Sequence, residues 1–182
     1  MNFKKHLIGL GLFLLIISGG WLSRGYFEQA NHPSDEAMIA NFYEHRARFQ
    51  ELINMLQEDR EIDLLFVNEV IFTDSRVWPR ECDSCFSKMR FDEYQEVTAC
   101  LGKWRPYWVS QKNGVMRMPV SADYSENNRN NYSDKGYAYF PQELPGVVDS
   151  LNGIGFKTEG IFYKKIGDGW YLYQETGWTC TG

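Results

Sequence analysis

The chain has 182 residues, of which 43% are hydrophobic and 16% aromatic, and its net charge is −5. The aromatic content is too high for a disordered chain and is sufficient for a packed core. Because an acidic protein repels phosphate backbones, the charge argues against a nucleic-acid-binding protein. After the N-terminal segment, about 155 residues remain, which is the size of a single domain.

Residues 1–27 have the pattern of an export segment. Lys4 and Lys5 form a positive start, and residues 7–22 then run without a charge, as in a signal peptide or a signal-anchor. We favour the anchor, because aromatic residues follow the apolar run as they do at a membrane boundary. The sequence therefore predicts a transmembrane helix with the membrane as its partner, or a cleaved signal. Either alternative places residues 28–182, as one domain, in the periplasm of a bacterium.

A long amphipathic helix is predicted over residues 35–58. Ser34 can cap its first turn, and Asp35 and Glu36 suit the positive end of the helix dipole. Apolar residues then recur at helical spacing, which indicates packing against a core. These residues are Met38, Phe42, Phe49, Leu52, Ile53 and Leu56.

The rest of the chain shows one shorter helix and several strands. Residues 64–72 are apolar and β-branched, as in a strand, and Asp92 with Gln95 forms a capping box for a second helix. Further strands are predicted at 115–120, 135–140, 160–166 and 170–176, the last two joined by a glycine-containing hairpin loop. Since helices come first and strands later, we expect an α+β domain with two helices on a small antiparallel sheet that ends in this hairpin.

Three of these segments carry a resemblance to known proteins. The helix that begins near Ser34, the Gly136–Tyr139 strand and the Trp170–Tyr173 strand resemble a group of small uncharacterised bacterial envelope proteins. The resemblance covers most of the chain after residue 34, but its motifs are structural and not catalytic. It implies an exported bacterial protein and carries over no activity.

Four cysteines offer the sharpest chemical pattern: Cys82, Cys85, Cys100 and Cys180. In an oxidising compartment, an even number of cysteines favours disulfide bonds, and sequence alone leaves all three pairings open. Two alternatives remain. Cys82 and Cys85 have the spacing of a redox pair, although acidic neighbours disfavour a lowered thiol pKa. They also have the spacing of half a zinc site, although the other two cysteines lie far apart.

Aromatic residues of the predicted strands and of one loop could form a binding surface. Alternation along a strand sends Tyr171 and Tyr173 to one face and Trp170 to the other. Exposed Tyr and Trp side chains suit protein or carbohydrate recognition, whereas cross-strand pairing would use them only for stability. The candidate surface comprises Trp104, Trp108, Tyr137, Tyr139, Tyr171 and Tyr173.

The sequence contains no motif that decides for an enzyme. The nucleophile elbow Gly-x-Ser-x-Gly is absent, and no metal-binding or cofactor-binding motif stands out. We therefore expect a non-enzymatic binding or structural domain of the cell envelope, without a cofactor or metal, that contacts an envelope protein and no nucleic acid. The alternatives are a hydrolase of an envelope polymer and a thiol-redox or metal module that uses the four cysteines.

Overall fold

The computed structural model describes residues 30–125, 131–156 and 158–178. The helices of this part are α2 (Asp35–Glu44), α3 (Arg46–Glu58) and α4 (Lys88–Ala99). The strands are β1 (Ile62–Phe66), β2 (Val70–Phe72), β3 (Val77–Trp78), β4 (Trp108–Lys112), β5 (Val115–Tyr124), β6 (Asn131–Tyr139), β7 (Gly160–Lys165) and β8 (Trp170–Trp178).

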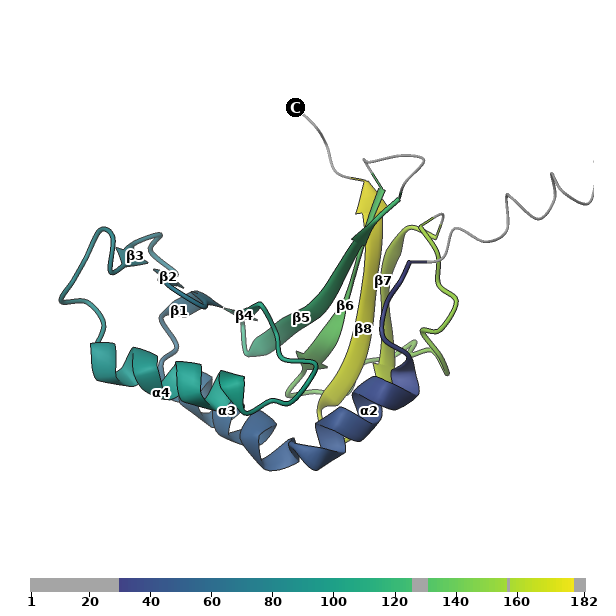
Figure 1. Cartoon of the computed structure of the whole chain (residues 1–182), viewed down its shortest axis with the longest axis horizontal. Helices are drawn as coiled ribbons and strands as arrows, with labels where there is room; N and C mark the ends of the chain where they lie inside the picture. The colour runs from purple at the N-terminus through teal and green to yellow at the C-terminus, as the bar shows by residue number, and fades with distance from the viewer. Residues whose placement is uncertain (1–29, 126–130, 157, 179–182) are drawn as a thin grey trace, which may run out of the picture.

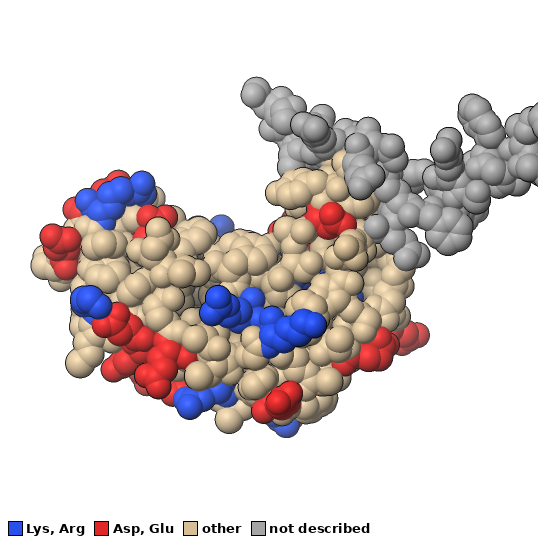
Figure 2. All heavy atoms as spheres, viewed as in Figure 1, with Lys and Arg blue, Asp and Glu red and all other residues tan. Residues whose placement is uncertain are grey.

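All eight strands form one antiparallel sheet in the order β3-β2-β1-β4-β5-β6-β8-β7. The helices cover one side of this sheet (Figure 1). On the other side, the surface is hollowed between the end that carries β2 and β3 and the upper ends of β5 to β8 (Figure 2). The expected α+β domain with a small sheet is therefore wrong, because the described part is mostly β.

The expected long amphipathic helix over residues 35–58 is also wrong, because the chain breaks at His45 into α2 and α3. His45 has φ −110° and ψ 17°, which ends the regular helix. Asn41, in the last turn of α2, bonds through both atoms of its side-chain amide to the loop after α4. Because Phe42 and Phe49 lie about two turns apart, both stay on the core side, and the apolar pattern does not reveal the break.

The aromatic residues among the apolar positions predicted over 35–58 do form the centre of the core. Phe42 and Phe49 are fully buried. The ring centroid of Phe49 lies 4.7 Å from that of Tyr137 and 5.4 Å from that of Trp170, and Phe42 lies 5.2 Å from Trp170. Each such buried side chain contributes about 1.5–3 kcal/mol to folding. These contacts hold α2 and α3 against β6 and β8.

The predicted transmembrane helix, and with it the inner-membrane and periplasmic location, requires a correction. Within residues 30–125, 131–156 and 158–178, no helix has both the length and the apolar character needed to cross a membrane. Residues 1–27, which carry the expected export segment, lie outside the described residues.

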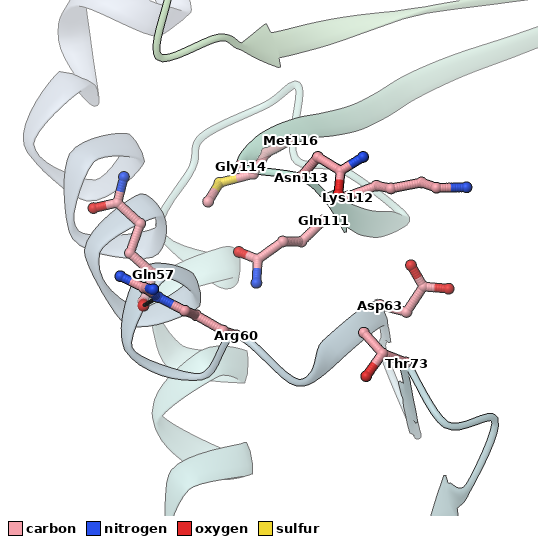
Figure 3. Close-up of a pocket in the computed structure, with 9 residues that line it drawn as sticks. All are labelled: Gln57, Arg60, Asp63, Thr73, Gln111, Lys112, Asn113, Gly114 and Met116. Carbon is pink, nitrogen blue, oxygen red and sulfur yellow. Dashed lines mark hydrogen bonds between the residues drawn. The ribbon is translucent and has the colours of Figure 1, made fainter.

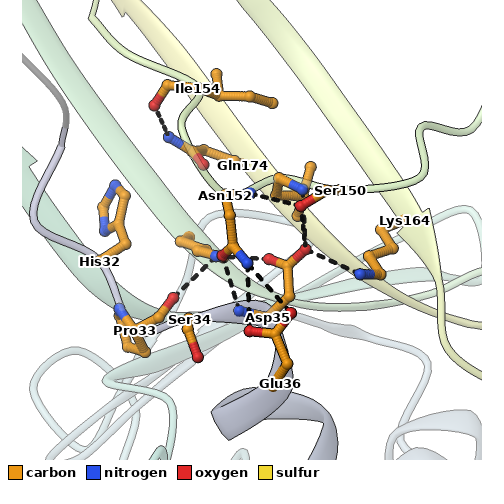
Figure 4. A network of polar contacts seen from close by, with 12 residues as sticks. His32, Pro33, Ser34, Asp35, Glu36, Ser150, Asn152, Ile154, Lys164 and Gln174 are labelled. Carbon is orange, nitrogen blue, oxygen red and sulfur yellow. Dashed lines mark hydrogen bonds and ion pairs between the residues drawn. The ribbon is translucent and has the colours of Figure 1, made fainter.

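A buried carboxylate fixes the start of α2 (Figure 4). Asp35 is fully buried, and its two oxygens accept from the Nζ atoms of Lys135 at 2.7 Å and Lys164 at 3.0 Å. The backbone N–H of Leu151 and the hydroxyl of Ser150 donate to it at 2.9 and 3.2 Å. Although burial raises the pKa of Asp35, the hydrogen bonds from Lys135, Leu151 and Lys164 outweigh it and hold this pKa below its usual value.

His32 joins the chain just before α2 to the side of the sheet that the helices cover. Its ring nitrogens lie 2.9 Å from the hydroxyl of Ser121 and 2.8 Å from that of Ser133. Gln174 of β8 donates to Ser133 as well, at 3.1 Å. Burial, together with the positive charge of Lys135, lowers the pKa of His32 to about 4, so the ring is neutral near pH 7.

Removing the Asp35 charge will test how much the fold depends on it. In the Asp35→Asn variant, Lys135 keeps a buried positive charge without its carboxylate, so we expect the free energy of unfolding to fall by about 3 kcal/mol. Urea denaturation followed by circular dichroism measures this change. The control is Glu36→Gln, which removes an exposed carboxylate one residue further on and should change stability far less. Equal effects of the two substitutions would contradict the central role of Asp35.

The lowered pKa of His32 predicts that the stability of the fold depends on pH. Its pKa is about 4 in the folded protein and about 6.5 in the unfolded chain. Between these values only the unfolded chain binds the proton, so stability is greatest above pH 6.5 and falls as the pH falls towards 4. We expect a loss of about 3 kcal/mol across this window. In the His32→Asn variant the loss should shrink, whereas in His45→Asn it should persist. If the stability of His32→Asn depends on pH as strongly as that of the wild type, His32 is not the cause of the effect.

Candidate functional site

An open groove of about 820 Å³ lies beside the β4–β5 turn, at the edge of the helix layer. Most of its lining is polar, and the residues come from the end of α3, from β1, from the end of β2 and from the β4–β5 hairpin (Figure 3). They are Gln57, Arg60, Asp63, Thr73, Gln111, Lys112, Asn113, Gly114 and Met116.

The groove exists because α3 stops before it covers the whole sheet. The helix ends at Glu58, whereas β4 and β5 continue towards their turn at Asn113 and Gly114. These two residues have φ values of 54° and 77°, the left-handed pair that a two-residue hairpin of type I′ requires. The end of the hairpin therefore projects past the helix and leaves its inner side open to the groove.

Gln111 is the residue in the groove that lacks a partner. It pairs in register with the fully buried Met116, so both side chains lie on the side of the sheet that faces the helices. Only 7% of Gln111 is exposed, and its Oε1 atom is buried without a hydrogen bond to the described residues. Figure 3 shows the amide directed into the space between Arg60 on one side and Asp63 and Thr73 on the other. A buried carbonyl oxygen of this kind costs about 1–3 kcal/mol unless a donor reaches it.

Charged groups of both signs also line the groove. Arg60 and Lys112 supply positive charge and Asp63 supplies a carboxylate. None of the three makes an ion pair with another residue in the described part of the chain, and the Nε of Arg60 donates to the carbonyl of Gln57 at 3.2 Å. The groove therefore has free groups for a ligand that carries both a negative and a positive charge.

The lining favours binding over catalysis. Among its described residues, Asp63 is the one carboxyl group and Thr73 the one hydroxyl group, and neither His nor Cys takes part. General acid–base catalysis needs a positioned pair of titratable groups, and covalent catalysis needs an activated nucleophile. The groove offers instead one amide, two positively charged groups and one carboxylate. This combination is a pattern of recognition.

This site was not predicted from the sequence, although one signal was present. An Asn-Gly pair between alternating apolar residues is a strong hairpin signal, and Asn113-Gly114 stands between Val109 and Met118. Such a hairpin would have paired Gln111 with Met116 and placed both on the core side. A polar residue on a core face is then a candidate for function.

The predicted disulfide bonds need correction. Cys82, Cys85 and Cys100 are free thiols, and no disulfide joins any two of them. The reason is spatial for Cys100, because α4 lies between it and the other two cysteines and spans about 18 Å. Disulfides need Cα atoms within about 7 Å. Cys180 lies outside the described residues.

The two neighbouring thiols interact with each other in another way. The Sγ of Cys85 donates to the carbonyl of Cys82 at 3.2 Å. Hydrogen bonding by Cys85, helped by the nearby Arg76, lowers the pKa of Cys82. Burial raises the pKa of Cys85. The thiol-redox module that the sequence offered as an alternative stays a prediction. Within the described residues, no group of three or more His, Cys, Asp or Glu side chains is arranged to hold a metal ion.

Three tyrosines of the candidate aromatic surface are buried. Tyr137, Tyr171 and Tyr173 are at most 1% exposed. Tyr137 lies in the core and donates to the carbonyl of Met38 at 3.0 Å, while Tyr171 accepts from the N–H of Leu144 at 3.1 Å. These three side chains therefore offer no exposed area to a partner.

The other members of the candidate surface are half-buried and lie apart. Tyr139 packs on Trp170, with ring centroids 5.4 Å apart. Trp104 lies under the ammonium group of Lys103 at 4.7 Å, and Trp108 is at the start of β4. The structure thus does not bring the six predicted aromatic residues together into one surface.

Comparisons with known proteins add no assignment. No protein-family model, no curated protein and no solved structure matches this chain. The case for a function therefore rests on the groove and its chemistry.

Two glutamines allow a test of the unpaired amide. Gln174 is as deeply buried as Gln111, but its Nε2 donates to Ser133 and to the carbonyl of Ile154 at 3.1 and 3.0 Å. Methionine has nearly the shape of glutamine and no polar amide. We expect Gln111→Met to raise the free energy of unfolding by about 1 kcal/mol and Gln174→Met to lower it by a similar amount. Chemical denaturation measures both, and destabilisation by Gln111→Met would show that its amide is already satisfied.

Proposed function

We propose that this chain is a non-enzymatic binding domain whose groove holds a small zwitterionic ligand with an amide group, of the class of short peptides. The observation that carries this proposal is the buried Oε1 of Gln111, which has no hydrogen-bond partner in the described part of the chain. Native structures pair almost all such atoms, so an exception that faces a groove marks the place of a missing donor.

The ligand class follows from the groups around Gln111. A side-chain amide offers one acceptor and two donors, and another amide complements it with both kinds of group. Arg60 and Lys112 suit a terminal carboxylate, and Asp63 suits a terminal amine. A short peptide carries all three groups in one small molecule.

The size of the groove agrees with this class. Its volume of about 820 Å³ is within the range of about 300–1,000 Å³ that is usual for small-molecule sites. Most of the lining residues belong to β-strands or to the tight β4–β5 turn, which favours a preformed site over one that assembles on binding. A protein partner, which the sequence also led us to expect, stays a prediction.

Titration with three probes tests the proposal. We expect alanyl-alanine to shift the ¹H–¹⁵N signals of Gln111, Lys112 and Asn113 in the full chain. Alanine lacks the amide and N-acetylalanine lacks the amine, so each should bind about tenfold more weakly, which corresponds to the loss of about 1.4 kcal/mol. The Gln111→Met variant should bind alanyl-alanine no better than alanine.

The control for this titration is Gln50→Met, because Gln50 is exposed on α3 and lies outside the groove lining. It should bind alanyl-alanine with the wild-type affinity. The proposal fails when millimolar alanyl-alanine leaves the groove signals of the wild-type protein unchanged, or when Gln111→Met retains the preference for the dipeptide.

A further inference from the structure

The face of the sheet away from the helices carries a cluster of polar and aromatic side chains. The pairing register places these residues on adjacent strands, with Asp134 of β6 directly opposite Glu175 of β8, and Tyr163 of β7 opposite Tyr173 of β8. We call this set the open-face cluster; it consists of Tyr107, Arg117, Tyr132, Asp134, Tyr163, Tyr173 and Glu175. It is separate from the groove, because Gln111 and Met116 lie on the helix side of the sheet.

Glu175 has a full set of partners in this cluster. Arg117 donates from Nη1 to its Oε2 at 3.1 Å, and the hydroxyl of Tyr132 donates to its Oε1 at 3.1 Å. The second terminal nitrogen of Arg117 donates to the hydroxyl of Tyr163 at 2.9 Å, and the guanidinium carbon lies 5.7 Å from the ring centroid of Tyr173. These contacts hold the guanidinium of Arg117 in one place and pair it with the carboxylate of Glu175.

Asp134 lacks such partners. Among the described residues, its one side-chain hydrogen bond comes from the hydroxyl of Tyr107 at 3.4 Å, which is long for this kind of bond. Burial and the nearby charge of Glu175 raise the pKa of Asp134, against the opposing effect of Tyr107. Two carboxylates directly opposite each other on neighbouring strands destabilise a sheet. A feature that costs stability in this way is characteristic of a functional site.

Aromatic rings border this carboxylate and stay accessible to solvent. Tyr107 is 39% exposed and Tyr124 is 59% exposed. The ring of Trp108 lies 6.3 Å from that of Tyr107, and Trp108 is half-buried. No described helix covers this side of the sheet (Figure 1), and the hollow in Figure 2 lies on it.

We propose that the open-face cluster binds a saccharide, with a sugar ring against Tyr107 and its hydroxyl groups donating to Asp134. A hydroxyl group and a carboxylate form short, charge-assisted hydrogen bonds, which would supply the donors that Asp134 lacks. The apolar face of a sugar ring matches an exposed aromatic ring, which presents an apolar body beside a polar tip. An amine ligand is the alternative outcome of the test, because a carboxylate also accepts a hydrogen bond from an ammonium group.

Disaccharide titrations of the full chain test this proposal. N,N′-diacetylchitobiose and cellobiose are the probes, and 1,6-diaminohexane is the probe for an amine site. We expect at least one disaccharide to shift the ¹H–¹⁵N signals of Asp134, Tyr107 and Glu175. It should also quench the fluorescence of the aromatic residues beside Asp134. The affinity should change little between low and high salt, because a neutral sugar forms no ion pair with the protein.

Two substitutions and one control locate the site. Asp134→Asn removes the acceptor charge and should weaken disaccharide binding at least tenfold while leaving the protein folded, because it also relieves the repulsion with Glu175. Tyr107→Ala changes an exposed loop residue and should weaken binding to a similar degree. Asp168→Asn makes the same change of charge in the exposed β7–β8 turn and should bind as the wild type does.

Three results would overturn the proposal. The first is that neither disaccharide shifts the open-face signals at millimolar concentration. The second is that 1,6-diaminohexane binds there more tightly than both disaccharides. The third is that Asp134→Asn and Tyr107→Ala, both folded by circular dichroism, keep the wild-type affinity. The groove titration with alanyl-alanine is unaffected by any of these results, since its residues are different.

Discussion

The buried ion pair between Asp35 and Lys135 is the constraint on which the arrangement of this fold depends. Transferring a carboxylate and an ammonium group out of water costs several kcal/mol for each ion, so the pair is tolerable only when all its partners are in place. Those partners come from β6, from β7 and from the loop at Ser150 and Leu151. The start of α2 is thereby fixed on the sheet.

The candidate sites of this structure are identified by comparing polar groups that have hydrogen-bond partners with polar groups that lack them. Asp35 and Gln174 show that the fold supplies hydrogen bonds to polar groups that it buries. Gln111 and Asp134 are exceptions, one with an unpaired buried oxygen and the other with a single long hydrogen bond. A ligand is proposed at each of these two places, and the missing donors are the basis of both proposals.

Local signals in the sequence predict part of this fold. Ser34 and Asp35 do begin a helix, and the predicted strand over 160–166 agrees with β7 to within one residue, because turn and capping residues act on their neighbours alone. The break at His45 depends on contacts with the loop after α4, which no local pattern contains. Lys135 illustrates the same limit: a lysine in a strand indicates exposure, yet it is 1% exposed because Asp35 faces it.

The candidate sites are harder to predict than the fold, because they depend on strand register. Asp134 and Glu175 are far apart in sequence, and only the pairing of β6 with β8 places them opposite each other. A shift of one residue would turn Asp134 towards the core and Lys135 away from Asp35. The ion pair at Asp35 therefore selects the register that creates the open-face cluster, so the buried ion pair and the poorly paired carboxylate of Asp134 are two consequences of one alignment.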